Sequence, residues 1–110
     1  VMNSYVAAYG VYGLMIVTDL KGKVIAVNDR DASGKPLDTA YLYERNVSGS
    51  EWFQNTMAER YFTAQGALTG TVVEPWTVNS DMQRLYGSDG HSLTFSAPVR
   101  DASGRAFAIW

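Results

Sequence analysis

Apolar and polar residues alternate most clearly in two pairs of short segments, one near each end of the chain. In chain order, the segments and the turns between them are Leu14–Asp19, Leu20–Lys23 and Val24–Asn28, then Thr94–Asp101, Ala102–Gly104 and Arg105–Trp110. β-branched and aromatic residues are frequent in all four segments, which favours strands over helices. Each turn follows an Asp and contains a Gly three residues later, and Gly tolerates the positive φ of tight turns. The pattern predicts two β-hairpins that are neighbours in one antiparallel sheet.

Helical spacing occurs at three other places. Met2, Tyr5, Val6 and Tyr9 recur every three or four residues and stop at Gly10, as expected of the last turns of a helix. Ser48–Glu51 resembles a capping box with Ser48 or Ser50 as the N-cap. It predicts a helix from Glu51 to about Tyr61, with apolar side chains on one flank: Trp52, Phe53, Met57 and Tyr61.

The remaining segments complete the predicted order of elements. Ser80–Tyr86 is a helical turn stopped by Gly87, and Thr71–Glu74 is a short strand before Pro75. The region 29–36 is polar, with Gly and Pro, and is predicted to be a loop. The order is helix, two strands, helix, short strand, two strands, which predicts an α+β fold with an antiparallel sheet.

Length allows one domain over residues 1–110. The chain begins at Val1 and ends in the strand-like Arg105–Trp110, and we interpret it as a piece of a longer protein whose N-terminal helix is truncated. The longest apolar runs, such as Leu14–Val17, are far shorter than the ~20 residues of a membrane span.

Composition narrows the chemistry. The chain has no Cys and one His, which excludes disulfides, thiolate metal sites and Cys-attached haem. A net charge of -2 without clustered Lys or Arg argues against nucleic acid. Seven Tyr and three Trp are more amphipathic rings than a small core needs and indicate a lined pocket.

Five segments in order carry a resemblance to a known family: Val17–Asp29, Gly34–Leu37, Ser50–Phe53, Tyr86–Gly90 and Phe95–Asp101, followed by Gly104 and Trp110. The chain from about Tyr12 to Trp110 resembles the extracytoplasmic Cache (PAS-like) sensor domain of bacterial methyl-accepting chemotaxis receptors. The resemblance implies an antiparallel sheet with a helix packed behind it and a small-molecule pocket on the other face. It also implies a periplasmic domain of an inner-membrane receptor, between two membrane spans that lie outside this chain, and a possible homodimer.

The chain departs from some members of that family. Amino-acid-binding double Cache receptors carry an Arg two positions before the Trp-aromatic pair, where this chain has Ser50. Haem-binding relatives need Cys and His that this chain lacks. We therefore expect no cofactor and a small organic acid as the ligand.

Six residues are the candidate ligand-binding set: Trp52, Arg60, Tyr61, Trp76, Tyr86 and Ser96. Arg60 offers a planar fork for a carboxylate, with Tyr61 beside it, although a cation at a helix C-terminus is also common on a solvated surface. Trp52 could close a pocket or belong to the core. Trp76 could form a pocket wall or be an exposed loop anchor. Tyr86 is a hydroxyl donor. Ser96, with Thr94, contacts ligand only if the polar face of its strand lines the pocket.

Other polar residues have simpler interpretations. Asp19 and Asp101 could pair as an acid and a base, but each sits at a Gly-bearing turn, so turn capping is favoured. The segment Asp29–Gly34 lacks the closing Glu of a calcium loop. His91 is expected at the surface. Without a nucleophile and base, a phosphate loop or a metal cluster, we expect no enzyme.

The resulting hypothesis is a sensor for a short carboxylate that signals across a membrane. Two alternatives stay open. The same sensor could belong to a histidine kinase or nucleotide cyclase, or the chain could be a PAS-like interaction module that binds a protein and no ligand.

Overall fold

The computed structural model of the protein describes residues 2–110, which form helices and antiparallel strands. In chain order these are α1 (Met2–Tyr9), β1 (Ile16–Thr18), β2 (Val24–Val27), the 3-10 helix η1 (Ala40–Glu44), α2 (Glu51–Met57), β3 (Thr63–Ala64), β4 (Ala67–Leu68), β5 (Val72–Val78), α3 (Ser80–Tyr86), β6 (His91–Ser96), β7 (Pro98–Arg100) and β8 (Ala106–Ile109). All strand pairs are antiparallel. The predicted α+β class is confirmed.

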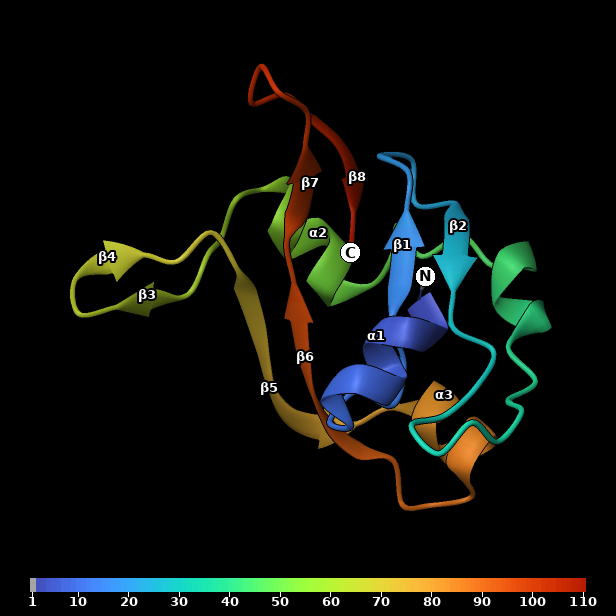
Figure 1. The fold of residues 1–110 in the computed structure, drawn as a ribbon. Coiled ribbons are helices and arrows are strands. Elements are labelled where there is room, and N and C mark those ends of the chain that lie inside the picture. Colours follow the sequence, from blue (N-terminus) through green and yellow to red (C-terminus); the bar gives the residue numbers. More distant parts are fainter. Residues whose placement is uncertain (1) are drawn as a thin grey trace.

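The two predicted hairpins are adjacent in a four-stranded sheet of order β2-β1-β8-β7. They meet where Thr18 of β1 pairs with Ile109 of β8. Beyond this point Ala97 and Trp110 exchange backbone hydrogen bonds of 2.8 and 3.0 Å. Strand β6 therefore leads directly into β7, and the β5–β6 ribbon continues from the sheet (Figure 1). The prediction that the hairpins are neighbours is confirmed.

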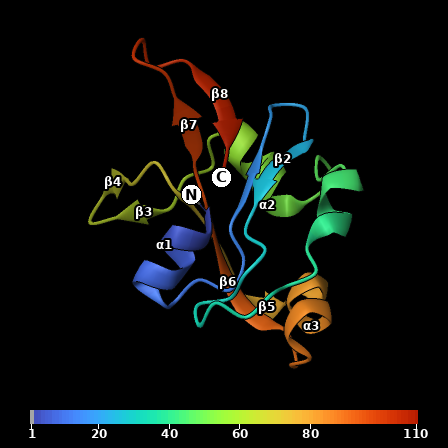
Figure 2. The same ribbon diagram turned by 45° about the vertical axis from the view of Figure 1, so that its right-hand side comes forward.

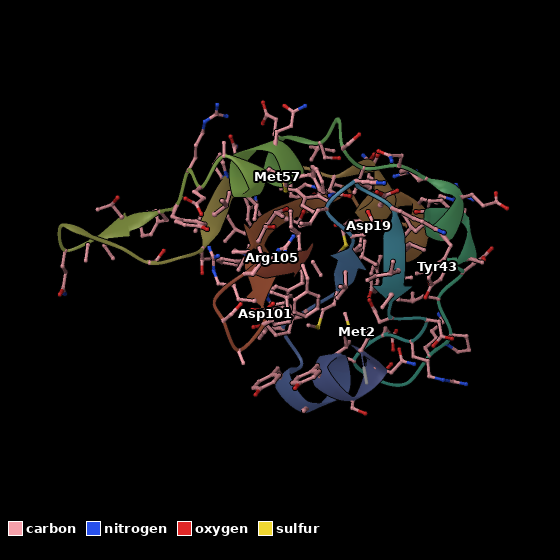
Figure 3. The ribbon with its side chains drawn as sticks, turned by 90° about the horizontal axis from the view of Figure 1, so that it is seen from above. Met2, Asp19, Tyr43, Met57, Asp101 and Arg105 are labelled. Atoms are coloured by element: carbon pink, nitrogen blue, oxygen red, sulfur yellow. The ribbon has the colours of Figure 1, made fainter. Side chains whose placement is uncertain are left out.

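Helices lie on opposite sides of the sheet. In Figure 1 helix α1 lies in front of the sheet and α2 behind it. Figures 2 and 3 also show the two helices on opposite faces. Val6 anchors α1, since it is fully buried. On the α2 side lies the main core cluster: Val24, Val27, Leu42, Val47, Phe53 and Ile109. This cluster joins the sheet to α2 and η1.

One turn geometry occurs three times, in Asp19–Lys23, Asp31–Lys35 and Asp101–Arg105. The Oδ1 atom of each Asp accepts the backbone N–H groups of the third and fifth residues at 2.9 to 3.0 Å. The Gly at the fourth position has a φ of 84° or 88° in all three turns, a conformation that Gly adopts without steric cost. The turn-capping interpretation of Asp19 and Asp101 is confirmed.

Helix α2 is shorter than the sequence predicts. It ends at Met57 instead of about Tyr61, because the chain turns at Ala58 and Glu59 takes a positive φ of 56°. Ser50 is the N-cap, but its side chain makes no capping hydrogen bond. Arg60 and Tyr61 therefore lie beyond the helix, and the prediction that Tyr61 extends its apolar flank is wrong.

Strand β5 is longer than predicted. It continues through Pro75 to Val78, and the pairing with β6 shifts between Glu74 and Thr77. A ladder irregularity of this kind tolerates a proline, which lacks the N–H that regular pairing uses. The sequence analysis also did not predict η1 or the small β3–β4 hairpin, which projects from the body of the protein in Figure 1.

The predictions for α1 and α3 are confirmed. Helix α1 ends at Tyr9, directly before Gly10, whose φ is 66°. Helix α3 spans Ser80–Tyr86 and ends at Gly87 in the left-handed conformation. The side chain of Asn79 caps its start by accepting hydrogen bonds from the N–H groups of Asp81 and Met82.

Candidate ligand-binding sites

Arg60 lies on the surface beyond the end of α2. Its side chain is exposed, and its Nη1 atom donates a 2.9 Å hydrogen bond to Oδ1 of Asn55. The cavities described below do not include it. Arg60 therefore has the second of its two predicted positions, that of a solvated cation at the surface.

Tyr61, in contrast, lines a cavity of about 100 Å³ between the end of α2 and the β7–β8 hairpin. Its hydroxyl accepts a 3.2 Å hydrogen bond from Nη2 of Arg100. The same guanidinium contacts Oε1 of Glu59 at 3.4 Å and donates through Nη1 to the carbonyl of Gly104 at 3.0 Å. Met57, Pro98 and Ile109 supply apolar walls. An arginine thus meets Tyr61 at this cavity, but it is Arg100 and not Arg60.

A repeated segment of the sequence carries a signal for Arg100. The six residues Arg30–Lys35 read Arg-Asp-Ala-Ser-Gly-Lys, and Arg100–Arg105 read Arg-Asp-Ala-Ser-Gly-Arg. In both segments the first Arg donates from Nη1 to the carbonyl of the Gly, at 3.1 Å for Arg30 and 3.0 Å for Arg100. The repeat shows that both arginines are held in place by their own turns. Only the fold shows that one of them reaches a cavity.

Trp52 is half-buried and packs against the core cluster. Its ring meets Phe53 edge-on, with 6.1 Å between the ring centroids. Trp76 is 64% exposed and stacks on His91, with the ring planes 1° apart and the centroids 6.3 Å apart. Trp52 therefore has the core position and Trp76 the exposed one, and the two do not face a common cavity. His91 is exposed, as expected.

Ser96 faces inward, as does the polar side of β6. It is 2% exposed, accepts a 2.9 Å hydrogen bond from Thr56 of α2, and donates to the carbonyl of Trp110 at 3.0 Å. Thr94 on the same face is partly buried and pairs across the strands with Glu74. Burial, with the charge of Glu51 as a second cause, raises the pKa of Glu74, against a hydrogen bond from Thr94 that lowers it.

Tyr86 lines a second cavity, of about 280 Å³, between α3, the segment after α1 and the loop at Asp31. Its hydroxyl donates a 2.6 Å hydrogen bond to the carbonyl of Gly13. Helix α3 and the β7–β8 turn lie at opposite ends of the molecule in Figure 1. The structure therefore divides the six predicted residues: Tyr61 and Tyr86 line separate cavities, while the other four line neither.

A cluster that the sequence analysis missed links η1 to α3. The hydroxyl of Tyr41 donates to Oδ1 of Asp81 at 2.8 Å, and Arg45 pairs with both oxygens of the same carboxylate at 2.7 and 2.8 Å. The guanidinium of Arg84 lies over the Tyr41 ring, 3.6 Å from its centroid. Burial and, second, the bond to Asp81 raise the pKa of Tyr41 to about 12. The cluster joins two elements distant in sequence, and its polar groups are occupied with one another.

Within residues 2–110, no group of three or more His, Asp or Glu side chains is arranged to hold a metal ion. In the same residues, no helix combines the length and the apolar character needed to cross a membrane. Comparison of the chain with protein-family models, with curated proteins and with solved structures gives no match.

Proposed function

We propose that the chain is an extracytoplasmic sensor domain of the chemotaxis-receptor type, and that it binds a short carboxylate between α2 and the β7–β8 hairpin. The observation that carries the ligand class is the pairing of Arg100 with the Tyr61 hydroxyl at a cavity with apolar walls. Arg is always charged and presents several N–H donors in a planar fork that matches a carboxylate. The proposal thus keeps Tyr61 and replaces Arg60 by Arg100.

The size of the cavity limits the ligand. Its volume of about 100 Å³ equals about three water molecules at ~30 Å³ each. A carboxylate with two or three carbons fits this space, its alkyl end against Met57 and Ile109 and its oxygens toward Arg100 and Tyr61. The contact of Arg100 with Glu59 is the longest of its three, at 3.4 Å, and both side chains are largely exposed. A ligand carboxylate can replace so weak a partner.

Binding at this cavity would act on the sheet. Ile109 of β8 lines the cavity. In the sheet it pairs with Pro98 of β7 on one side and with Thr18 of β1 on the other. A ligand that fits one arrangement of β7, β8 and α2 better than another shifts the population between the two arrangements. On this proposal the output domain would be that of a chemotaxis receptor, or alternatively of a histidine kinase or a nucleotide cyclase.

Propionate titration tests the site. We expect saturable shifts of the backbone amide signals of Tyr61 and Arg100 in NMR spectra at pH 7. Arg100→Gln should weaken binding by about tenfold or more, since a hydrogen bond to a charged group contributes about 1.5–3 kcal/mol. Arg30→Gln is the matched control, because Arg30 makes the same bond to its own turn but does not line this cavity. Equal effects of the two variants, or none, would contradict the proposal.

A second candidate function, protein interaction without a ligand, is favoured by one surface. The face of the β5–β6 ribbon turned away from α2 carries four large exposed apolar side chains: Trp76, Val78, Leu93 and Phe95, between 48% and 64% exposed. Contiguous apolar surface often marks an interface. Sedimentation of the wild type against Phe95→Ser separates the candidates. Concentration-dependent self-association that the substitution abolishes, without propionate binding, would favour the interaction module.

A further inference from the structure

The larger cavity, at the Tyr86 end of the molecule, differs from the first in charge. Its lining comes from three separate segments: Tyr12 and Gly13 after α1, Asp31 and Ser33 in the loop after β2, and Tyr86 at the end of α3. One carboxylate is present among the lining residues, and no Lys or Arg. The cavity is a depression of about 280 Å³ that is largely open to solvent.

Asp31 supplies a fixed negative charge at this cavity. Its Oδ1 atom accepts hydrogen bonds from the N–H of Ser33 at 2.9 Å, the hydroxyl of Ser33 at 2.7 Å and the N–H of Lys35 at 2.9 Å. The Ser33 hydroxyl is the largest of the causes that lower the pKa of Asp31, so the carboxyl is ionised at neutral pH. The ion pairs within residues 2–110 do not include Asp31. The charge of Lys35 also lowers the pKa of Asp31, but Lys35 forms no ion pair with it within the described residues, so the carboxylate can accept a ligand cation.

Two aromatic rings accompany this charge. Tyr86 is half-buried, and its hydroxyl is fixed to Gly13. Burial and, second, the nearby charge of Asp31 raise the pKa of Tyr86. The ring of Tyr12 packs edge-on against Tyr9, 6.0 Å between centroids, and stays 42% exposed. The faces of such rings attract cations.

We propose that this cavity binds a small organic cation of the alkylammonium class. The carboxylate of Asp31 and the rings of Tyr12 and Tyr86 favour a positive group, while the lack of a cationic lining residue disfavours an anion. This inference uses none of the residues of the carboxylate site and does not depend on the proposed function. The two sites, at opposite ends of the molecule, would select ligands of opposite charge.

Three small probes of similar size and different charge test charge selection: n-propylammonium, n-propanol and propionate. Each is titrated at pH 7 into the 15N-labelled protein, and the amide signals of Gly13 and Ser33 report on this cavity. We expect saturable shifts of both signals with n-propylammonium alone. Asp31→Asn keeps the oxygen that accepts the turn hydrogen bonds but removes the charge. It should weaken n-propylammonium binding by about tenfold or more.

The chain provides its own matched control. Asp101→Asn makes the same change in the turn with the same Asp-Ala-Ser-Gly sequence, but Asp101 does not line the cavity. It should leave binding unchanged. Tyr12→Leu, at an exposed position, should weaken binding without loss of the fold, and it provides a test if Asp31→Asn unfolds. The proposal is overturned if n-propanol shifts Gly13 and Ser33 as n-propylammonium does, or if Asp31→Asn or folded Tyr12→Leu binds like the wild type.

Discussion

The hydroxyl groups of Thr56 and Ser96 lie 2.9 Å apart in the protein interior and join α2 to β6. The two residues are 3% and 2% exposed. The Thr56 hydroxyl also lies 2.7 Å from the carbonyl of Trp52, and that of Ser96 lies 3.0 Å from the carbonyl of Trp110. This small polar bridge holds the helix that carries Trp52 against the strand that leads into β7.

Removing either hydroxyl should destabilise the fold by about 1 kcal/mol, the typical net contribution of one hydrogen bond. Thr56→Val and Ser96→Ala make this change with little change in shape. Urea unfolding followed by circular dichroism measures the free energy of unfolding of both variants. If the two hydroxyls act on each other, the double variant should lose less stability than the sum of the single losses. Thr77→Val, on the exposed part of β5, is the control. Strict additivity would contradict the bridge.

The three repeated turns differ in what surrounds their glycines. A Cβ atom on Gly22 would lie 2.6 Å from the backbone nitrogen of Ser48 and 2.9 Å from Oδ1 of Asn46, whereas Gly34 and Gly104 have open space. Gly34→Ala and Gly104→Ala should therefore lower the free energy of unfolding only through the strain of the positive φ, by about 1–2 kcal/mol. Gly22→Ala carries the same cost and a clash with backbone, so its loss of stability should be clearly larger. Equal melting temperatures for the three variants would refute this explanation.

Local sequence signals were sufficient for the hairpins and for the ends of α1 and α3. The Asp–Gly turns and Gly10 and Gly87 act within a few residues, through hydrogen bonds and φ values that the local sequence determines. The end of α2 could not be predicted in this way. Its apolar spacing continues to Tyr61, but Tyr61 lies at the cavity beside β7, and the chain leaves the helix at Ala58.

The candidate site depended more strongly on tertiary structure. Arg60 and Arg100 are equally plausible partners for a carboxylate by residue type, and proximity in sequence to Tyr61 favoured Arg60. The contact that exists, from Arg100 to the Tyr61 hydroxyl, spans 39 positions. The role of Asn28 could not be predicted from its neighbours in sequence either. It is fully buried, and its side chain forms hydrogen bonds with the backbone of Met15, Gly13 and Arg30.

Glu74 should make stability depend on pH in a defined direction. Burial raises the pKa of Glu74 in the folded protein, so the folded state prefers the protonated carboxyl. The resulting contribution is complete below the unfolded pKa, about 4.3, and is lost as the pH rises through the folded value. Glu74→Gln keeps a neutral, hydrogen-bonding side chain and should be more stable than the wild type at pH 7. The difference should shrink towards pH 3.

Exposed Glu44 on η1 provides the comparison for that experiment. Glu44→Gln should change the free energy of unfolding little at either pH. If Glu74→Gln is less stable than the wild type at pH 7, the ionised carboxylate stabilises the strand pair through Thr94, and the stated sign is wrong.

Tyr41 should be the tyrosine that resists ionisation. Burial and the bond to Asp81 raise its pKa to about 12, above the usual value of about 10. Because the folded pKa is the higher one, this contribution is present below pH ~10 and is lost as the pH rises through the folded value. Tyr41→Phe keeps the ring under Arg84 but should remove the latest step from an ultraviolet tyrosinate titration. Asp81→Asn should move that step to lower pH. Tyr43→Phe, at an exposed ring, is the control and should leave the step in place. If the step persists in Tyr41→Phe, another tyrosine produces it.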